Sequence, residues 1–278
     1  MTGPQPSPAG LTLRPVGVVH SEIRDRKKMP AWGAPAEVEI FSPYEPALHR
    51  IEKHTHLWIL AWLVQGRDER DVLQVTPRGV TDRGPAGLHG VFAVRSPARP
   101  NPIGMTTARL LARNGLRLRL DALDFLDQTP VLDIKPYFVT RDMIFSASGR
   151  QIGAASSREA LRDSLSVQAA HFHGSMTPCV AWTVRVVEHF RWSLHELNDP
   201  PSWNIAAPAH RLEVADALMG MTRVSLGRGT LRLHGEDAVE FIGEARYERL
   251  EPLPPTAQAI LAAHDSALFR VSASSRAC

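Results

Sequence analysis

Residues 90–104 constrain the fold more than any other segment, because three prolines fall within these positions. Each proline fixes its own φ angle and restricts the residue before it, so the run Arg99-Pro100-Asn101-Pro102 predicts a stiff, non-helical loop. The loop also carries Arg95, so it holds two arginines. A planar guanidinium in a rigid segment can hold an anionic group through two hydrogen bonds. A surface turn with incidental charge is the alternative on turn chemistry alone.

The chain has room for two domains, with 278 residues of which 44% are hydrophobic. The longest apolar run, residues 57–64, is too short to cross a bilayer, and the first residues lack the basic and apolar regions of a signal peptide. We therefore expect a cytoplasmic protein without a membrane partner. Cys179 and Cys278 are the two cysteines, which excludes a disulfide framework and a multi-cysteine metal site within one chain.

The first half of the chain has the pattern of short strands. Leu116, Leu118 and Leu120 alternate with charged residues, which is the period of a strand with one buried face. Other short apolar stretches in this half are separated by glycine and proline. Many short strands with turns between them favour a barrel or a sandwich. The sequence therefore predicts a mainly β N-terminal domain over residues 11–145.

The second half has a different pattern, which predicts an α+β domain over residues 155–270. Ser156 with Glu159 forms a capping box that opens a helix. Thr177 with Pro178 starts another helix, since proline at the first helical position loses no hydrogen bond. Residues 230–242 are predicted to form a hairpin around Gly235.

Three segments of the first half carry candidate functional side chains. The run His54-Thr55-His56 stands at the start of the most apolar strand, where a pair of edge histidines is the alternative interpretation. The proline-rich loop is the second segment. Residues 126–137 begin as a tight turn and continue as a strand that places Asp133 and Lys135 on one face. A β-turn followed by a surface ion pair explains the same residues.

Together these segments resemble the TrmO/TsaA-like family, tRNA methyltransferases that use S-adenosylmethionine. The resemblance spans about residues 13–138 and rests on T-H-L-W-I-L from Thr55, G-V-F-A-V-R-S-P-x-R-P-N-P-I-G from Gly90 and D-x-T-P-V-L-D-I-K-P-Y from Asp127. It implies a small β-barrel that binds S-adenosyl-L-methionine near the interface of a homodimer. The sequence lacks the glycine-rich fingerprint of a Rossmann fold, which agrees with a barrel. The resemblance further implies N6-methylation of the adenosine next to the anticodon, so tRNA is the expected partner.

The resemblance also implies a set of site residues. The catalytic candidates are Asp133, Asp127 and Lys135, and either carboxylate could accept a hydrogen bond from the adenosine amine and take its proton. Gln128 stands where the family usually has glycine, at a turn that can need an unusual backbone angle. The cofactor-binding candidates are Ser21, Thr55, His56, Arg95, Arg99, Asn101, Asp127, Gln128, Thr129 and Pro130.

The net charge of +3 hides a basic excess in the first half. The densest cluster of positive charge is formed by Arg24, Arg26, Lys27 and Lys28. Such a cluster can follow a phosphate backbone, and a solvated loop explains it equally well. If the acceptor is tRNA, we expect this cluster to contribute to binding.

Residues 169–243 carry a fainter resemblance, to the N-terminal domain of the E-type formylmethanofuran dehydrogenase proteins. Those proteins have cysteines where this chain has Thr177 and Val224, and a histidine where it has Ser175, so His173 alone remains of a metal site. A single imidazole makes a weak site, and no metal is expected. One alternative is that this domain holds a small-molecule methyl acceptor in place of tRNA. A second alternative, suggested by Gln128, is that the protein binds the cofactor without catalysing methyl transfer.

Overall fold

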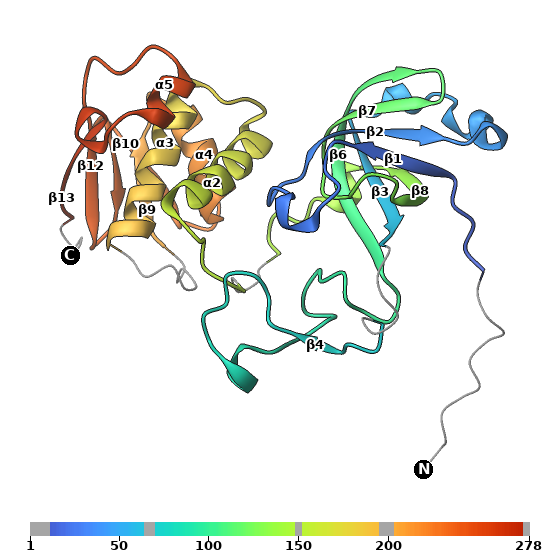
Figure 1. Cartoon of the computed structure of the whole chain (residues 1–278). Coiled ribbons are helices and arrows are strands. Elements are labelled where there is room, and N and C mark those ends of the chain that lie inside the picture. Colours follow the sequence, from blue (N-terminus) through green and yellow to red (C-terminus); the bar gives the residue numbers. More distant parts are fainter. Residues whose placement is uncertain (1–11, 64–69, 148–151, 195–202, 275–278) are drawn as a thin grey trace. The chain divides into compact units, whose positions relative to one another are not determined.

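Six strands of the first half close into an antiparallel barrel in the computed structural model, which describes residues 12–63, 70–147, 152–194 and 203–274 (Figure 1). Their order around the barrel is β1-β2-β7-β6-β3-β8. The prediction of a barrel followed by an α+β region is confirmed. The strands are β1 (Gly17–Ser21), β2 (Ala34–Ile40), β3 (His56–Trp62), β6 (Ile103–Asn114), β7 (Arg117–Leu123) and β8 (Pro130–Pro136).

Alternating side chains build the interior of the barrel. In β3, the side chains of Leu57, Ile59 and Ala61 are fully buried, and the residues between them face outward. In β7, Leu118 and Leu120 are buried between exposed arginines, so the predicted one-sided strand is confirmed. In these two strands, alternate side chains therefore enter the core and the side chains between them face outward.

The two ends of the barrel carry different connections. At the turn end, named for the turn of residues 127–130, β1, β3 and β7 finish and β6 and β8 begin. At the histidine end, β3 begins at His56 after the 3₁₀ helices η2 (Ser42–Leu48) and η3 (Ile51–Lys53). Six residue steps along β3 cover about 20 Å, which separates the two ends.

The connections at the turn end are short elements and turns. The described part of the connection from β3 to β6 contains the strand pair β4 (Gln74–Val75) and β5 (His89–Gly90), with the 3₁₀ helix η5 (Gly84–Gly87). Residues 91–102 form turns and bends without a helix, as the prolines predict. The basic helix η1 (Arg26–Lys28) lies between β1 and β2 at this end, whereas α1 (Val139–Asp142) follows β8 at the histidine end.

The chain divides into two units, the first of residues 1–77 and 82–144 and the second of residues 78–81 and 145–278. The second unit packs helices against a five-stranded sheet of order β10-β9-β11-β12-β13 (Figure 1). The predicted domain limits, 11–145 and 155–270, stay predictions. The strands are β9 (Ile205–Pro208), β10 (Leu231–His234), β11 (Ala238–Phe241), β12 (Ala245–Arg249) and β13 (Phe269–Ala273).

Helix α3 is the most buried helix among the described residues of the second unit. Its neighbours are α2, α4 and α5, and its residues from Val180 to Glu188 are all buried. The hydroxyl of Thr177 accepts the Val180 amide at 3.2 Å, so the predicted helix start is confirmed.

Within the described ranges, no helix combines the length and hydrophobicity that a membrane span requires. The helices are α2 (Arg158–His173), α3 (Pro178–His189), the π-helical η6 (Phe190–Leu194), α4 (Leu212–Thr222), α5 (Ala257–Ala262) and the 3₁₀ helix η7 (Asp265–Ala267).

Two local predictions for this unit are wrong. Residues 230–242 do not form a hairpin, because β10 pairs in parallel with β9 and β11 pairs antiparallel with the same strand. All four residues of β9 are buried, and a strand covered on both faces takes an inner place in a sheet with a partner on each side. Helix α2 is capped by Ser157 rather than Ser156, since the Ser157 hydroxyl accepts the Ala160 amide at 3.1 Å.

We predict that His189 makes the stability of the second unit depend on pH. Its Nδ1 lies 3.0 Å from the Tyr247 hydroxyl oxygen, and its ring meets Tyr247 and Phe269 edge-on. Burial lowers the pKa of His189 below its ordinary value of 6.5. Below that pH the unfolded chain binds a proton that the folded chain resists, so the free energy of unfolding should fall as the pH drops.

Urea unfolding at a series of pH values between about 5 and 7 measures this dependence. The variant His189→Phe should show a shallower fall than the wild type. The matched variant His264→Gln, at an exposed position, should keep the wild-type slope. Equal slopes in the wild type and His189→Phe would contradict the prediction.

Candidate functional site

The turn of residues 127–130 holds a carboxylate in a fixed position. Asp127 Oδ1 accepts a hydrogen bond from the Ser21 amide at 3.1 Å, and Oδ2 lies 3.3 Å from Arg24 Nε. The Ser21 hydrogen bond is the main cause that lowers the pKa of Asp127, and the charge of Arg24 acts in the same direction. Asp127 is therefore an ionised group that can accept hydrogen bonds from a ligand at neutral pH.

Gln128 adopts a backbone conformation that glycine reaches more easily. Its φ angle is +63°, in the left-handed region, and its amide donates to the Val19 carbonyl at 2.8 Å. The side-chain amide lies 3.3 Å from Asp127 Oδ1. The turn therefore forms with glutamine in place, at the cost that a side chain brings to this conformation.

The proline-rich loop uses its two arginines differently. Arg99 donates to three main-chain carbonyls, those of Val91, Val94 and Ser96, at 2.8, 2.5 and 2.6 Å. This guanidinium shapes the loop from within. Arg95 is exposed, so of the two arginines it is the one that faces solvent. Ligand binding by either residue stays a prediction, as does that by the exposed Asn101.

Asp124 is a candidate that the sequence analysis missed. It follows β7 directly, and the charge of Arg95 and the side chain of Thr106 act on its carboxyl group. The residue keeps exposed surface, yet desolvation of the carboxyl group raises the pKa of Asp124 above its ordinary value. In the sequence, Asp124 is marked only by its position three residues before Asp127, and it belongs to none of the three motifs.

The histidine end carries a second group of predicted residues. Thr55 Oγ1 lies 3.0 Å from His56 Nδ1, and the His56 ring centroid is 6.4 Å from that of Tyr137. On β8, the distance from Lys135 Nζ to Asp133 Oδ2 is 2.7 Å. Asp133 and Lys135 thus share one face, as their spacing predicts.

The structure separates the predicted cofactor-binding residues into two sets. Within one barrel, the sets lie at opposite ends of β3, about 20 Å apart. Thr55 and His56 form the set at the histidine end. The set at the turn end consists of Ser21, Arg95, Arg99, Asn101, Asp127, Gln128, Thr129 and Pro130.

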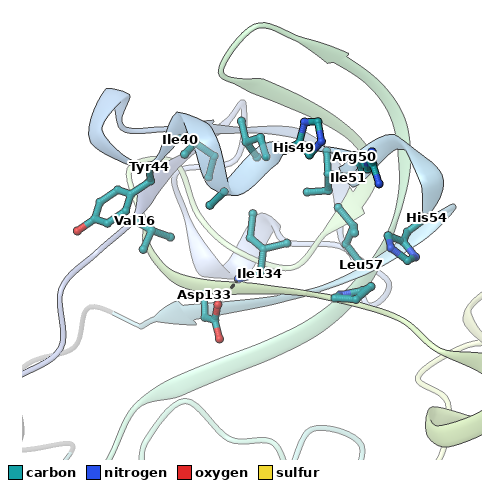
Figure 2. A pocket seen from close by; sticks show the side chains of 13 residues that line it. Val16, Ile40, Tyr44, His49, Arg50, Ile51, His54, Leu57, Asp133 and Ile134 are labelled. Atoms are coloured by element: carbon teal, nitrogen blue, oxygen red, sulfur yellow. Dashed lines mark hydrogen bonds between the residues drawn. The ribbon is translucent and has the colours of Figure 1, made fainter.

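A cavity of about 270 Å³ opens at the histidine end (Figure 2). Its lining is mostly apolar, with His49, Arg50 and His54 among the polar members. Figure 2 shows Ile134 directed toward the cavity and the carboxylate of Asp133 directed away from it. The cavity is therefore a space separate from the turn-end residues.

In the second unit, polar side chains contact one another at positions that correspond to the metal ligands of the formylmethanofuran dehydrogenase proteins. His173 Nδ1 lies 3.0 Å from Asp216 Oδ2, and the hydroxyl of Thr177 both caps α3 and donates to Glu213 at 3.0 Å. Among the described residues, no group of three or more histidine, cysteine, aspartate or glutamate side chains could hold a metal ion. Cys278 lies outside the described residues. The resemblance of this unit stays a prediction.

Known proteins match a large part of the chain, and the family model falls on the barrel. A family model described as the tRNA-methyltransferase O N-terminal domain matches residues 18–143. A probable S-adenosyl-L-methionine-binding protein of Methanothermobacter thermautotrophicus is 41% identical over 138 residues, which are 48% of this chain and 95% of that protein. A protein of the same description from Archaeoglobus fulgidus is 42% identical over 180 residues, which are 63% of this chain. The match spans 47% of that relative's length.

Some of the matched relatives carry enzyme names. The tRNA (adenine(37)-N6)-methyltransferase of Escherichia coli is 32% identical over 155 residues, which are 52% of this chain and 65% of that protein. The resemblance inferred from the three motifs is thereby confirmed. Since the Methanothermobacter relative is matched over nearly its whole length, the chain belongs to the TrmO family of S-adenosylmethionine-dependent methyltransferases.

Proposed function

We propose that this chain transfers the methyl group of S-adenosylmethionine to N6 of an adenosine in the anticodon loop of tRNA. The observation that carries the proposal is the contact between the turn and the basic cluster. Arg24, the first cation of the cluster, pairs with Asp127, which places η1 beside the turn. An ionised carboxylate and a basic segment thus meet at the turn end, where the second and third motifs lie.

The residues at the turn end fit the chemistry of the cofactor. S-adenosylmethionine has hydroxyl and ammonium donors, a carboxylate and an adenine ring. Asp127 can accept from the donors, and the exposed cation of Arg95 can bind the carboxylate. When bound, the cofactor supplies an electrophilic methyl group on a sulfonium centre.

The protein then has to align the acceptor and receive a proton. The residues present would hold N6 of the acceptor in line with that methyl group, and a carboxylate would receive the amine proton and pass it to solvent. The lowered pKa of Asp127 makes this carboxylate a poor proton acceptor. Asp133 lies three residues along β8 from Pro130, about 10 Å from the turn, and we assign it the proton.

We include in the proposal the homodimer that the family resemblance implies. In one barrel Thr55 and His56 lie about 20 Å from the turn. A second copy is a way to bring these residues and the turn-end residues of its neighbour into one site. Sedimentation of the purified chain tests this part of the proposal by itself.

The test is transfer of labelled methyl from S-adenosylmethionine to bulk tRNA, followed by digestion and identification of the labelled nucleoside. The proposal expects the label in N6-methyladenosine. Label in a small molecule of a cell extract, and none in tRNA, would favour the alternative acceptor. Cofactor binding without label transfer to any acceptor would favour a silent binding protein.

We predict that tRNA binding depends strongly on salt through the basic cluster. The Lys27 amide donates to Asp25 Oδ1 at 2.9 Å, which fixes the start of η1 while its basic side chains stay exposed. Each cation on a phosphate releases counterions, so Arg26→Ala and Lys27→Ala should each lower the slope of log K against log salt by about 1.

Filter binding of labelled tRNA over a salt series measures these slopes. The variant Arg119→Ala removes an exposed cation from the outer face of β7 and serves as the matched control. Its slope should equal that of the wild type. Equal slopes in all three variants would contradict a role for the cluster in binding tRNA.

A further inference from the structure

The outer face of β8, β3 and β6 carries a compact group of aromatic and charged side chains. Directly paired residues of antiparallel strands point to the same side, and the inward positions of β3 are fully buried. We call this group the aromatic face. Its members are His56 and Trp58 on β3, Asp133 and Lys135 on β8, Arg109 on β6, and Tyr137 just after β8.

Three aromatic rings lie next to one another on this face. The ring centroids of Trp58 and Tyr137 are 5.8 Å apart with an angle of 43° between their planes, and that of His56 is 6.4 Å from Tyr137. The Tyr137 amide donates to the His56 carbonyl at 3.0 Å, which fixes the tyrosine beside β3. All three residues are half-buried, so each keeps ring surface that the barrel core does not use.

Charged side chains lie next to these rings at positions fixed by the pairing of the strands. Lys135 is paired directly with Trp58, and Arg109 is paired directly with His56. Asp133 is the diagonal neighbour of Trp58, a position about 7–8 Å away in an antiparallel sheet. Its Oδ1 accepts from the Ile134 amide and its Oδ2 lies 2.7 Å from Lys135 Nζ, so the carboxylate has a defined position.

This arrangement of aromatic rings, a carboxylate and two cations matches one kind of ligand. A flat heterocycle stacks on aromatic side chains, and single-stranded RNA is recognised in this way. An exocyclic amine on the heterocycle would meet the carboxylate of Asp133. The phosphates on either side would meet Lys135 and Arg109. A purine with an exocyclic amine, attached to a phosphate backbone, has all three features.

We propose that Trp58 and Tyr137 form the platform on which the acceptor adenine stacks, splayed out of the tRNA loop, with its amine next to Asp133. The inference rests on the proposed function and names the surface that receives the acceptor. Trp58 and Tyr137 act as positioning residues. They touch the base and set the distance from its amine to the carboxylate.

The test uses an anticodon stem-loop RNA with 2-aminopurine at the target position, because stacking on an aromatic ring quenches the emission of this base. Binding to the wild type should change the emission. Trp58→Leu and Tyr137→Leu should each remove most of that change and weaken the methylation of unmodified RNA about tenfold or more, mainly through KM. Trp58→Phe, which keeps a ring, should restore part of both signals.

The control variant is Trp62→Leu. Trp62 lies on the same outer face of β3, where its ring contacts Arg70 rather than Tyr137. The variant Trp62→Leu should keep the emission change and the KM of the wild type. Calorimetric titration with S-adenosylmethionine should give the same affinity for the wild type and all variants, since the platform receives the acceptor.

The outcomes separate this inference from the proposed function. If the wild type methylates tRNA and both leucine variants keep its emission change and KM, the platform is refuted and the proposed function stands. If the wild type methylates no tRNA but the emission change depends on Trp58, the platform stands as an adenine-binding surface and the proposed function fails. If Trp58→Leu separates two copies in sedimentation and leaves the emission change intact, the face is an interface and the platform is refuted.

Discussion

The variant Asp133→Asn should slow methyl transfer by a factor of about 10² to 10⁴ and leave the binding of S-adenosylmethionine unchanged. Asparagine keeps the size of the side chain and can still accept a hydrogen bond, but it cannot take the amine proton. The side chain of Asp133 is about half exposed, at 47%, and its ion pair with Lys135 lies at the surface. Its loss should therefore cost little stability, about 0–1 kcal/mol.

Single-turnover transfer of labelled methyl, at saturating cofactor and tRNA, measures the rate without product release. The matched control is Glu37→Gln, which breaks a surface ion pair with Arg117 on another part of the barrel. That variant should keep the wild-type rate. A wild-type rate in Asp133→Asn would remove Asp133 from the chemistry and leave Asp127 as the candidate.

The second large effect is expected in the buried ion cluster of the second unit. Glu188 on α3 has no exposed surface and contacts Arg158, Arg162 and Arg185. The distances are 2.7 Å to Arg162 Nε and 2.9 Å to Arg185 Nε. Asp265 lies 2.6 Å from Arg185 Nη2 and 2.8 Å from Arg158 Nη2, which extends the cluster.

Replacing Glu188 by alanine should lower the free energy of unfolding by about 3–5 kcal/mol. The change removes the buried carboxylate shared by three guanidinium groups and leaves their positive charges without its compensation. Glu248→Ala is the control, because Glu248 is 43% exposed and pairs with Arg246 and Arg270 near the surface. It should cost about 1 kcal/mol or less.

Urea unfolding followed by tryptophan fluorescence compares the two variants with the wild type. Trp182 and Trp203 lie in the core of the second unit and report on its unfolding. Equal midpoints for Glu188→Ala and Glu248→Ala would show that the cluster contributes no more than a surface pair. Methyl transfer by the folded fraction tests whether the barrel depends on this unit.

The barrel could be predicted from the sequence because its strands have a local signature. The alternation of Leu118 and Leu120 with arginines defines one buried face, and prolines exclude a helix between residues 97 and 102. These signals depend on near neighbours alone. The same is true of Thr177 at the start of α3, whose hydroxyl caps an amide three residues later.

Features set by distant partners could not be predicted. The failed hairpin depended on β9, which lies more than twenty residues before β10 in the chain and takes the place between β10 and β11. Motif spacing also gives no strand register, so the distance of His56 from the turn became visible only in the barrel. The desolvation of Asp124, beside Thr106 and Arg95, arises from three separate segments. Local sequence therefore indicated which residues matter but not which of them meet.

Calorimetric titration of the purified full chain with S-adenosylmethionine tests the turn most directly, because methyl transfer begins with that complex. We expect saturable binding to the wild type, weakened about tenfold to a hundredfold by Asp127→Asn through loss of a charged hydrogen-bond acceptor. A folded wild-type protein that gives no binding heat at any cofactor concentration and temperature tested, or equal affinity in Asp127→Asn, would contradict the assignment of the turn as the cofactor site.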